Sequence, residues 1–183
     1  MTSDGASWTG GWWSGATRRA SPNFDTRAAN AEIALVVLHH ISLPAGQFEG
    51  DAVSDFFEND LDVTRYPMLA ELADVHVSAH FFLRRTGEIL QFVSCNDRAW
   101  HAGVSAWRGR GGCNDFSIGI EIEGDAVTAF ADLQYAALDE LLASIKHNYP
   151  IKALSTHSEI AAGRKIDPGP TFDWSQLASR WPV

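Results

Sequence analysis

The chain has 183 residues, and 45% of them are hydrophobic, which suits one packed domain and argues against a disordered segment. Its formal net charge of −9 argues against a phosphate-rich partner such as nucleic acid. No apolar run is long enough to span a membrane, so a membrane-embedded protein is not expected.

Two features predict the cellular compartment. The N-terminal residues lack a basic segment followed by an apolar one, so no secretory signal is expected. The only two cysteines, Cys95 and Cys113, are too few for a framework of disulfides. Both features favour a cytoplasmic location, and the sequence shows no sign of an obligate protein partner.

The N-terminal part begins with residues 1–30, which are rich in Gly, Ser, Trp and Arg and show no hydrophobic period. We expect an irregular arm there that packs on the domain through its tryptophans. A continuous apolar run predicts a buried strand over residues 32–40. Apolar residues at near-helical spacing predict a short helix over 50–61, and Pro67 is expected to open another helix, over 67–72.

The middle of the chain predicts a hairpin, with strands over residues 75–83 and 89–93 joined by a turn at Thr86–Gly87. A loop is expected over 96–107. The glycine-rich residues 108–112 predict a flexible connector.

The C-terminal part alternates strands and helices. Residues 116–123 alternate as in a strand, 132–148 predict the strongest helix, and 151–156 predict a short strand. A terminal helix is expected over 173–181, capped by Asp173. The apolar face of the strongest helix is predicted to consist of Leu133, Ala136, Ala137, Leu141, Leu142 and Ile145.

This mixture of elements predicts an α/β fold, with a mixed β-sheet flanked by helices. No internal repeat or linker is visible, so residues 1–183 are expected to form a single domain.

Three residues far apart in the sequence predict a metal site. His39 ends an apolar run, while His157, Lys165 and Asp167 lie in a segment that residues 168–170, Pro-Gly-Pro, make rigid. Zinc prefers imidazole and carboxylate ligands, and a catalytic zinc site keeps one position open. His39, His157 and Asp167 fit such a set, although a single histidine at a strand end is more often an ordinary hydrogen-bonded group.

Further polar residues are candidates for catalysis. Glu121 shares a strand face with Glu123 and could take a proton from water, or it could lie on a solvated strand edge. Lys165 could stabilise an oxyanion or be a surface lysine. His80 and His101 could support the ligands or contact a substrate, and hydrogen bonding within its strand is an equally good interpretation of His80.

Two other chemistries compete for these residues. Glu121 and Asp167 could act as the carboxylate pair of a glycosidase, but His39, His157 and Lys165 would then have no role. A cysteine nucleophile at Cys113 is weaker still, because the sequence assigns it no partner.

Five segments resemble the zinc-dependent N-acetylmuramoyl-L-alanine amidases, and the similarity runs in order from about residue 18 to 180. These segments are 37–44, 77–80, 98–105, 113–121 and 156–174. The resemblance is strongest to the branch that acts on cytosolic 1,6-anhydro-muropeptides. It implies an amidase/peptidoglycan recognition protein-like fold with Zn²⁺ in a surface groove, held by His39, His157 and Asp167. It further implies that Glu121 is the general base and that Lys165 stabilises the tetrahedral intermediate.

Together with the resemblance, these considerations give a candidate substrate-binding set, namely His40, His80, Trp100, His101 and Arg110. His40 stands where relatives commonly have Asn. Arginines that hold acidic groups in relatives are absent at His76 and Gly112, and Arg110 is the candidate replacement for the second.

The implied activity is hydrolysis of the amide between N-acetylmuramic acid, preferably in the 1,6-anhydro form, and L-alanine, in cell-wall recycling. The expected partner is therefore a small-molecule muropeptide, with no nucleic acid and no membrane. A non-catalytic module that senses peptidoglycan fragments is the alternative. The complete ligand set, with Glu121 and Lys165 present, favours the enzyme.

Overall fold

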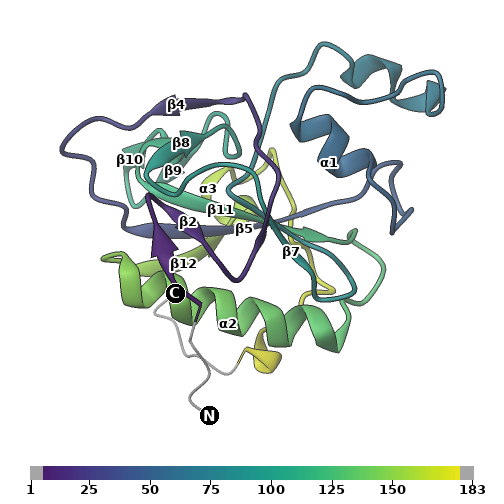
Figure 1. Ribbon diagram of the computed structural model, residues 1–183. Coiled ribbons are helices and arrows are strands. Elements are labelled where there is room, and N and C mark those ends of the chain that lie inside the picture. Colours follow the sequence, from purple (N-terminus) through teal and green to yellow (C-terminus); the bar gives the residue numbers. More distant parts are fainter. Residues whose placement is uncertain (1–5, 178–183) are drawn as a thin grey trace.

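A six-stranded sheet forms the centre of the computed structural model, which describes residues 6–177 (Figure 1). In spatial order the strands are β12 (Ala153–Thr156), β5 (Leu35–Ile41), β11 (Ser117–Glu123), β6 (Phe81–Leu83), β7 (Ile89–Gln91) and β3 (Thr17–Arg18). The strands from β12 to β6 run parallel, β7 is antiparallel to β6, and β3 is parallel to β7. The prediction of a mixed sheet is therefore confirmed.

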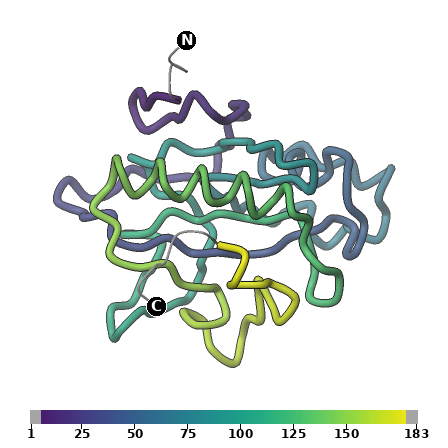
Figure 2. The backbone as a smooth tube through the Cα atoms, turned by 90° about the horizontal axis from the view of Figure 1, so that it is seen from below, coloured from purple at the N-terminus to yellow at the C-terminus, as the bar shows by residue number. Residues whose placement is uncertain are grey.

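Helices cover both faces of this sheet. The long helix α2 (Asp132–Asn148) crosses one face, as Figure 2 shows from below. The short helix α1 (Ala52–Phe57) packs on the opposite face, beside Phe82 and Leu90. Helix α3 (His157–Ile160) directly follows β12. Three 3₁₀ helices complete the described part, namely η1 (Pro67–Leu72), η2 (Cys113–Asp115) and η3 (Trp174–Gln176).

Strand β11 separates the main core from the opposite face of the sheet. Ile118, Ile120 and Ile122 are buried in one cluster with five side chains of α2. The buried side chains of α2 in that cluster are Tyr135, Leu138, Leu141, Leu142 and Ile145. Because side chains alternate along a strand, Gly119 and Glu121 face the other way. The predicted alternation thus places a carboxylate on the face away from the main core.

Several predictions of irregular structure are wrong. Among the described residues, seven short strands occupy the predicted arm, loop and connector. One is β3, which joins the central sheet, and the other six form separate pairs. These six are β1 (Trp8–Thr9), β2 (Trp12–Trp13), β4 (Phe24–Thr26), β8 (Asp97–Ala99), β9 (Ala106–Trp107) and β10 (Arg110–Gly111). They pair as β1–β2, β4–β8 and β9–β10. Strands of two or three residues are too short to show an alternating pattern, so the sequence gives no period that predicts them.

Other elements are shorter than predicted. The strand expected over 75–83 is regular only at Phe81–Leu83, and the helix expected over 50–61 only at Ala52–Phe57. The helix predicted from Pro67 to Leu72 is present as a 3₁₀ helix. At the C-terminus, Asp173 caps η3 by accepting a hydrogen bond from Ser175 N at 2.9 Å, and residues 178–181 of the predicted helix lie outside the described residues.

Helix α2 has the predicted bounds, and Leu141, Leu142 and Ile145 of the predicted face are buried, but the rest of that face differs. Leu133 is 61% exposed and Ala136 is exposed, whereas Gln134 and Tyr135 are buried. This orientation of α2 is explained by two hydrogen bonds to the sheet. The Gln134 side-chain amide donates to Glu123 O at 3.0 Å and to Leu83 O at 3.3 Å. A hydrophobic period cannot predict a buried glutamine of this kind.

We predict that Leu142→Ala lowers the free energy of unfolding of the metal-free protein by about 2–5 kcal/mol, because Leu142 is fully buried against the sheet. The matched change Leu133→Ala, on the exposed side of the same helix, is expected to cost less than about 0.5 kcal/mol. Urea unfolding of both variants measures the difference. Equal losses would contradict the observed orientation of α2.

Both cysteines are buried and free, in agreement with the absence of a disulfide framework. Within residues 6–177, no helix has the length and apolar character required to cross a membrane.

Candidate metal centre

His39, His157 and Asp167 come together at one edge of the sheet. His39 lies near the end of β5, and His157 opens α3 immediately after β12. Because β5 and β12 are neighbouring parallel strands, their C-terminal ends meet at the same edge. The Nδ1 atoms of the two histidines are 2.9 Å apart, and Asp167 Oδ2 lies 3.1 Å from His39 Nδ1 and 2.9 Å from His157 Nδ1. All three residues are buried.

Local hydrogen bonds hold His157 and Asp167 in place. Thr156 and Glu159 form a capping box around the first turn of α3, which fixes His157 as its first residue. Ser158 N donates to Asp167 O at 3.0 Å, and His40 Nδ1 donates to Pro168 O at 2.9 Å. The Thr-His-Ser-Glu pattern is a signal of a helix start, although no helix was predicted at this position.

The proton positions on the two imidazoles favour a cation between them. His157 Nε2 lies 3.2 Å from the carbonyl of Ala102, which can only accept, so Nε2 carries the hydrogen and Nδ1 presents a lone pair. His39 Nε2 contacts His101 Nδ1 at 2.9 Å, and donation in that direction leaves His39 Nδ1 with a lone pair as well. Two imidazole lone pairs and a carboxylate then face one another with no hydrogen between them, an arrangement that a cation stabilises.

The spacing of these atoms suits zinc. Metal–ligand distances of about 2.0–2.1 Å in a tetrahedral site place the ligand atoms about 3.3 Å apart. The separations of 2.9–3.1 Å are close to that value. Burial lowers the pKa of His39 to about 4, so its ring is neutral at pH 7, as a metal ligand must be.

Glu121 lies beside this group. It is paired with His39 in the β11–β5 register, and its Oε1 is 3.9 Å from His39 Nδ1. Burial, with a smaller contribution from Asp167, raises the pKa of Glu121 well above 4.5. Its Oε2 is buried and has no hydrogen-bond partner among the described residues. The alternative of a solvated strand edge is excluded, because β5 and β6 flank β11 on both sides.

Two adjoining cavities give access to the candidate ligands. The site cavity, of about 310 Å³, is lined by Glu121, His157 and Asp167 among others. The side cavity, of about 490 Å³, is lined by His76, Arg98 and Arg164 among others. Lys165, Trp100 and His101 line both cavities, so each can face whatever occupies them.

The predicted substrate-binding residues fall into two groups. His40, Trp100 and His101 line at least one cavity. His80 is fully buried, where its Nδ1 accepts from Gly119 N at 3.0 Å and its Nε2 donates to Asp97 O at 3.1 Å, so the structure favours a supporting role over substrate contact. Arg110 stacks over the Phe116 ring at 3.8 Å rather than lining either cavity.

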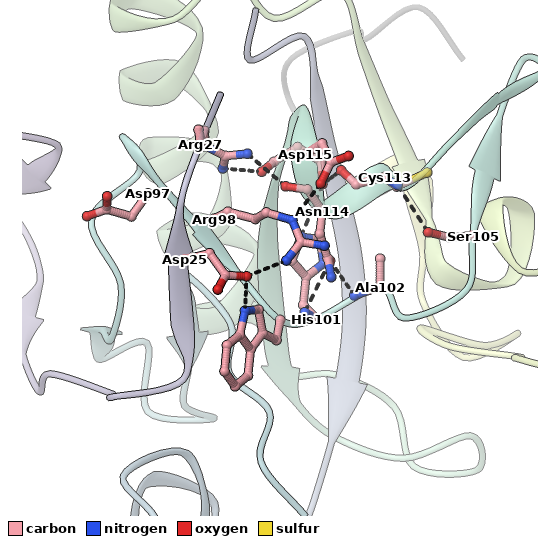
Figure 3. A network of polar contacts seen from close by, with 12 residues as sticks. Asp25, Arg27, Asp97, Arg98, His101, Ala102, Ser105, Cys113, Asn114 and Asp115 are labelled. Carbon is pink, nitrogen blue, oxygen red and sulfur yellow. Dashed lines mark hydrogen bonds and ion pairs between the residues drawn. The ribbon is translucent and has the colours of Figure 1, made fainter. Parts of the chain in front are cut away.

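A polar network on the wall of the side cavity was not predicted (Figure 3). Arg98 pairs with Asp25 at 2.6 Å and with Asp115 at 2.5 Å. The same Asp25 accepts a hydrogen bond from Trp100 Nε1 at 2.7 Å, which fixes the indole. Asp25, Arg98 and Asp115 come from separate segments and are ordinary surface residue types, so the sequence alone carries no signal for the network.

The chain is similar in sequence to known proteins. Residues 29–170 match the family described as N-acetylmuramoyl-L-alanine amidase. The chain is 46% identical over 169 residues to the 1,6-anhydro-N-acetylmuramyl-L-alanine amidase AmpD of Escherichia coli K12, and the alignment covers 91% of this chain and 92% of that protein.

Solved structures agree as well. A crystal structure of a selenomethionine AmpD derivative superposes with a TM-score of 0.90 at 43% identity, covering 93% of this chain and 97% of that chain. The amidase AmiD of E. coli, solved with anhydro-N-acetylmuramic acid-L-Ala-D-γ-Glu-L-Lys as substrate, superposes with a TM-score of 0.60 at 31% identity, covering 95% of this chain and 65% of that chain. Because the family match spans well over half of the chain and the relatives align along most of it, the chain belongs to the N-acetylmuramoyl-L-alanine amidase family.

Proposed function

We propose that this chain is a zinc hydrolase that cleaves the amide between 1,6-anhydro-N-acetylmuramic acid and L-alanine in soluble cell-wall fragments. The observation that carries the proposal is the convergence of His39 Nδ1, His157 Nδ1 and Asp167 Oδ2, with a buried carboxylate beside them. The name of the E. coli relative supports the anhydro-muramyl substrate, and the AmiD complex supports a muropeptide as ligand.

In this proposal His39, His157 and Asp167 hold the zinc ion. When bound there, zinc supplies a Lewis acid that polarises the amide carbonyl and lowers the pKa of the attacking water to about 7. The protein contributes neutral imidazoles, a fixed carboxylate and a buried position with limited access for solvent.

Glu121 acts as the general base. Its unpartnered Oε2 is free to accept the proton of the attacking water, and the raised pKa lets the carboxyl then pass the proton to the leaving amine of L-alanine. Lys165 lines the same cavity and donates to the oxyanion that develops from the amide carbonyl.

The side cavity offers a place for the peptide or the sugar. Arg164 and Lys165 bring positive charge to its lining, while Asp25 and Asp115 neutralise Arg98. Trp100 presents an indole that can cover an apolar or sugar face. The single domain over 1–183 and the cytoplasmic location stay predictions, and both are consistent with a role in recycling muropeptides.

The proposal is tested with anhydro-muramoyl-tripeptide and mass spectrometry of the products. We expect the native chain to release free peptide and anhydro-muramic acid, a chelator to stop the release, and added zinc to restore it. Polymeric peptidoglycan is expected to be a poorer substrate. A protein that retains zinc but releases no peptide would support the non-catalytic binding module instead.

A further inference from the structure

We propose that His101 is a positioning residue, which accepts the Nε2 proton of His39 and thereby keeps His39 Nδ1 free to bind the metal. This inference deepens the proposed metal site and rests on it. It replaces the substrate-contact role predicted for His101 with a role in the metal centre.

A directional chain of hydrogen bonds carries the inference. Ser117 Oγ donates to Cys113 O at 2.6 Å, because a carbonyl can only accept. The same oxygen is 3.1 Å from His101 Nε2, so it must accept there, and His101 Nε2 carries the hydrogen. His101 Nδ1 is therefore an acceptor, and His39 Nε2 donates to it at 2.9 Å. One backbone carbonyl thus determines the protonation of two imidazoles.

The opposite direction would disrupt the site. If His101 donated through Nδ1, His39 would accept at Nε2 and carry its own hydrogen on Nδ1, where the metal must bind. Ser117 would then have to turn its hydrogen toward His101 and leave two oxygens 2.6 Å apart with no hydrogen between them.

Gly119 supplies independent support. This glycine lies inside β11, where glycine weakens a strand, and often marks the close approach of another group. A Cβ atom at position 119 would lie 2.4 Å from His101 Cγ and 2.5 Å from His101 Nδ1. The central strand therefore lacks a side chain at the point where the His101 ring lies.

The backbone around His101 serves the other histidine ligand. Asn114 Oδ1 accepts from His101 N at 3.2 Å and from Ala102 N at 2.8 Å, as Figure 3 shows. The carbonyl of Ala102 in turn accepts from His157 Nε2 at 3.2 Å. Two consecutive residues thus orient both imidazole ligands, one through a side chain and one through a carbonyl. Partners of this kind typically contribute about 10–100-fold to metal affinity.

The direct test is NMR of the zinc-loaded native protein with ¹⁵N-labelled histidines. We expect His101 to carry its hydrogen on Nε2 only, and we expect a coupling across the hydrogen bond between His39 Nε2 and His101 Nδ1. A hydrogen on His101 Nδ1 would overturn the inference. This readout requires neither substrate nor turnover.

Variants provide the second test, with zinc affinity measured by competition with a chromophoric chelator. His101→Phe removes the acceptor and is expected to weaken zinc binding by about 10–100-fold. His101→Asn keeps an acceptor oxygen near the position of Nδ1 and should recover part of that loss. Gly119→Ala, which touches no ligand, should weaken binding by displacing the His101 ring. His147→Asn, on the exposed side of α2, is the matched control.

The outcomes separate this inference from the proposed function. Native protein that binds no zinc would contradict the proposed function itself. Native protein that binds zinc, with unchanged affinity in folded His101→Phe and Gly119→Ala, would contradict the role of His101 alone. Thermal melting of each metal-free variant shows whether it is folded, and the NMR result on the native chain stands whatever the variants do.

Discussion

Replacing Asp167 by alanine is expected to lower zinc affinity by more than about 100-fold and to abolish release of peptide from muropeptides. Asp167 is the one carboxylate in the candidate ligand set, and the other two candidate ligands are imidazoles, which bind a metal in the uncharged form. Loss of a partner outside the ligand set costs about 10–100-fold, so loss of a charged ligand should cost more. With zinc absent, no Lewis acid is available to polarise the amide.

The measurement combines zinc content after dialysis with the thermal midpoint in the presence and absence of zinc. A ligand that binds only the folded state raises the midpoint, so zinc should stabilise the native chain and leave Asp167→Ala unchanged. Asp173→Ala removes an exposed carboxylate six residues further along. It should keep the zinc content of the native chain and the same rise in midpoint with zinc, although loss of the η3 cap lowers both midpoints. Full zinc content in Asp167→Ala would contradict the assignment of this ligand.

The parts of the fold predicted from sequence are those with a long hydrophobic signal. The apolar run before His39 predicts β5, the isoleucine alternation predicts β11, and the helical period predicts the bounds of α2. In each case the burial of apolar side chains contributes most of the stabilisation. The apolar residues therefore recur in the sequence with the spacing of a strand or a helix. The buried Gln134 shows the limit, because its hydrogen bonds to the sheet depend on where the strands lie.

Some features of the candidate site could likewise be predicted from the sequence, and others depend on the fold. His39, His157 and Asp167 could be predicted because few residue types bind zinc, and a rigid turn follows Asp167. The burial of Glu121 could not be predicted, since it depends on β11 lying between β5 and β6. The sequence could not decide between the two roles expected for His101, support of a ligand or contact with substrate, because its partners His39 and Ser117 come from other segments. The sequence signal for the position of His101 is Gly119, a glycine inside a strand where a side chain would collide with the His101 ring.

The raised pKa of Glu121 leads to a prediction about stability as well as activity. Burial favours the protonated carboxyl in the folded metal-free protein. The stability that depends on this group is therefore fully present below its unfolded pKa of about 4.3, and it is lost as the pH rises through the raised folded pKa. Glu121→Gln is neutral at every pH, so the metal-free variant should be at least as stable as the native chain at pH 7 and should lack that pH dependence.

Activity should change in the opposite direction. Glu121→Gln is expected to lower kcat by about 10²–10⁴-fold, because an amide cannot take the proton of the attacking water, while zinc remains bound. Glu123→Gln is the matched control on the same strand, since Glu123 accepts from Glu49 N at 2.7 Å and Arg85 N at 2.8 Å and lies outside both cavities. We expect that control to lose stability and to keep its kcat. A Glu121→Gln variant with native kcat and bound zinc would show that another group takes the proton, and loss of kcat in both variants would point to damage of the sheet rather than to loss of a base.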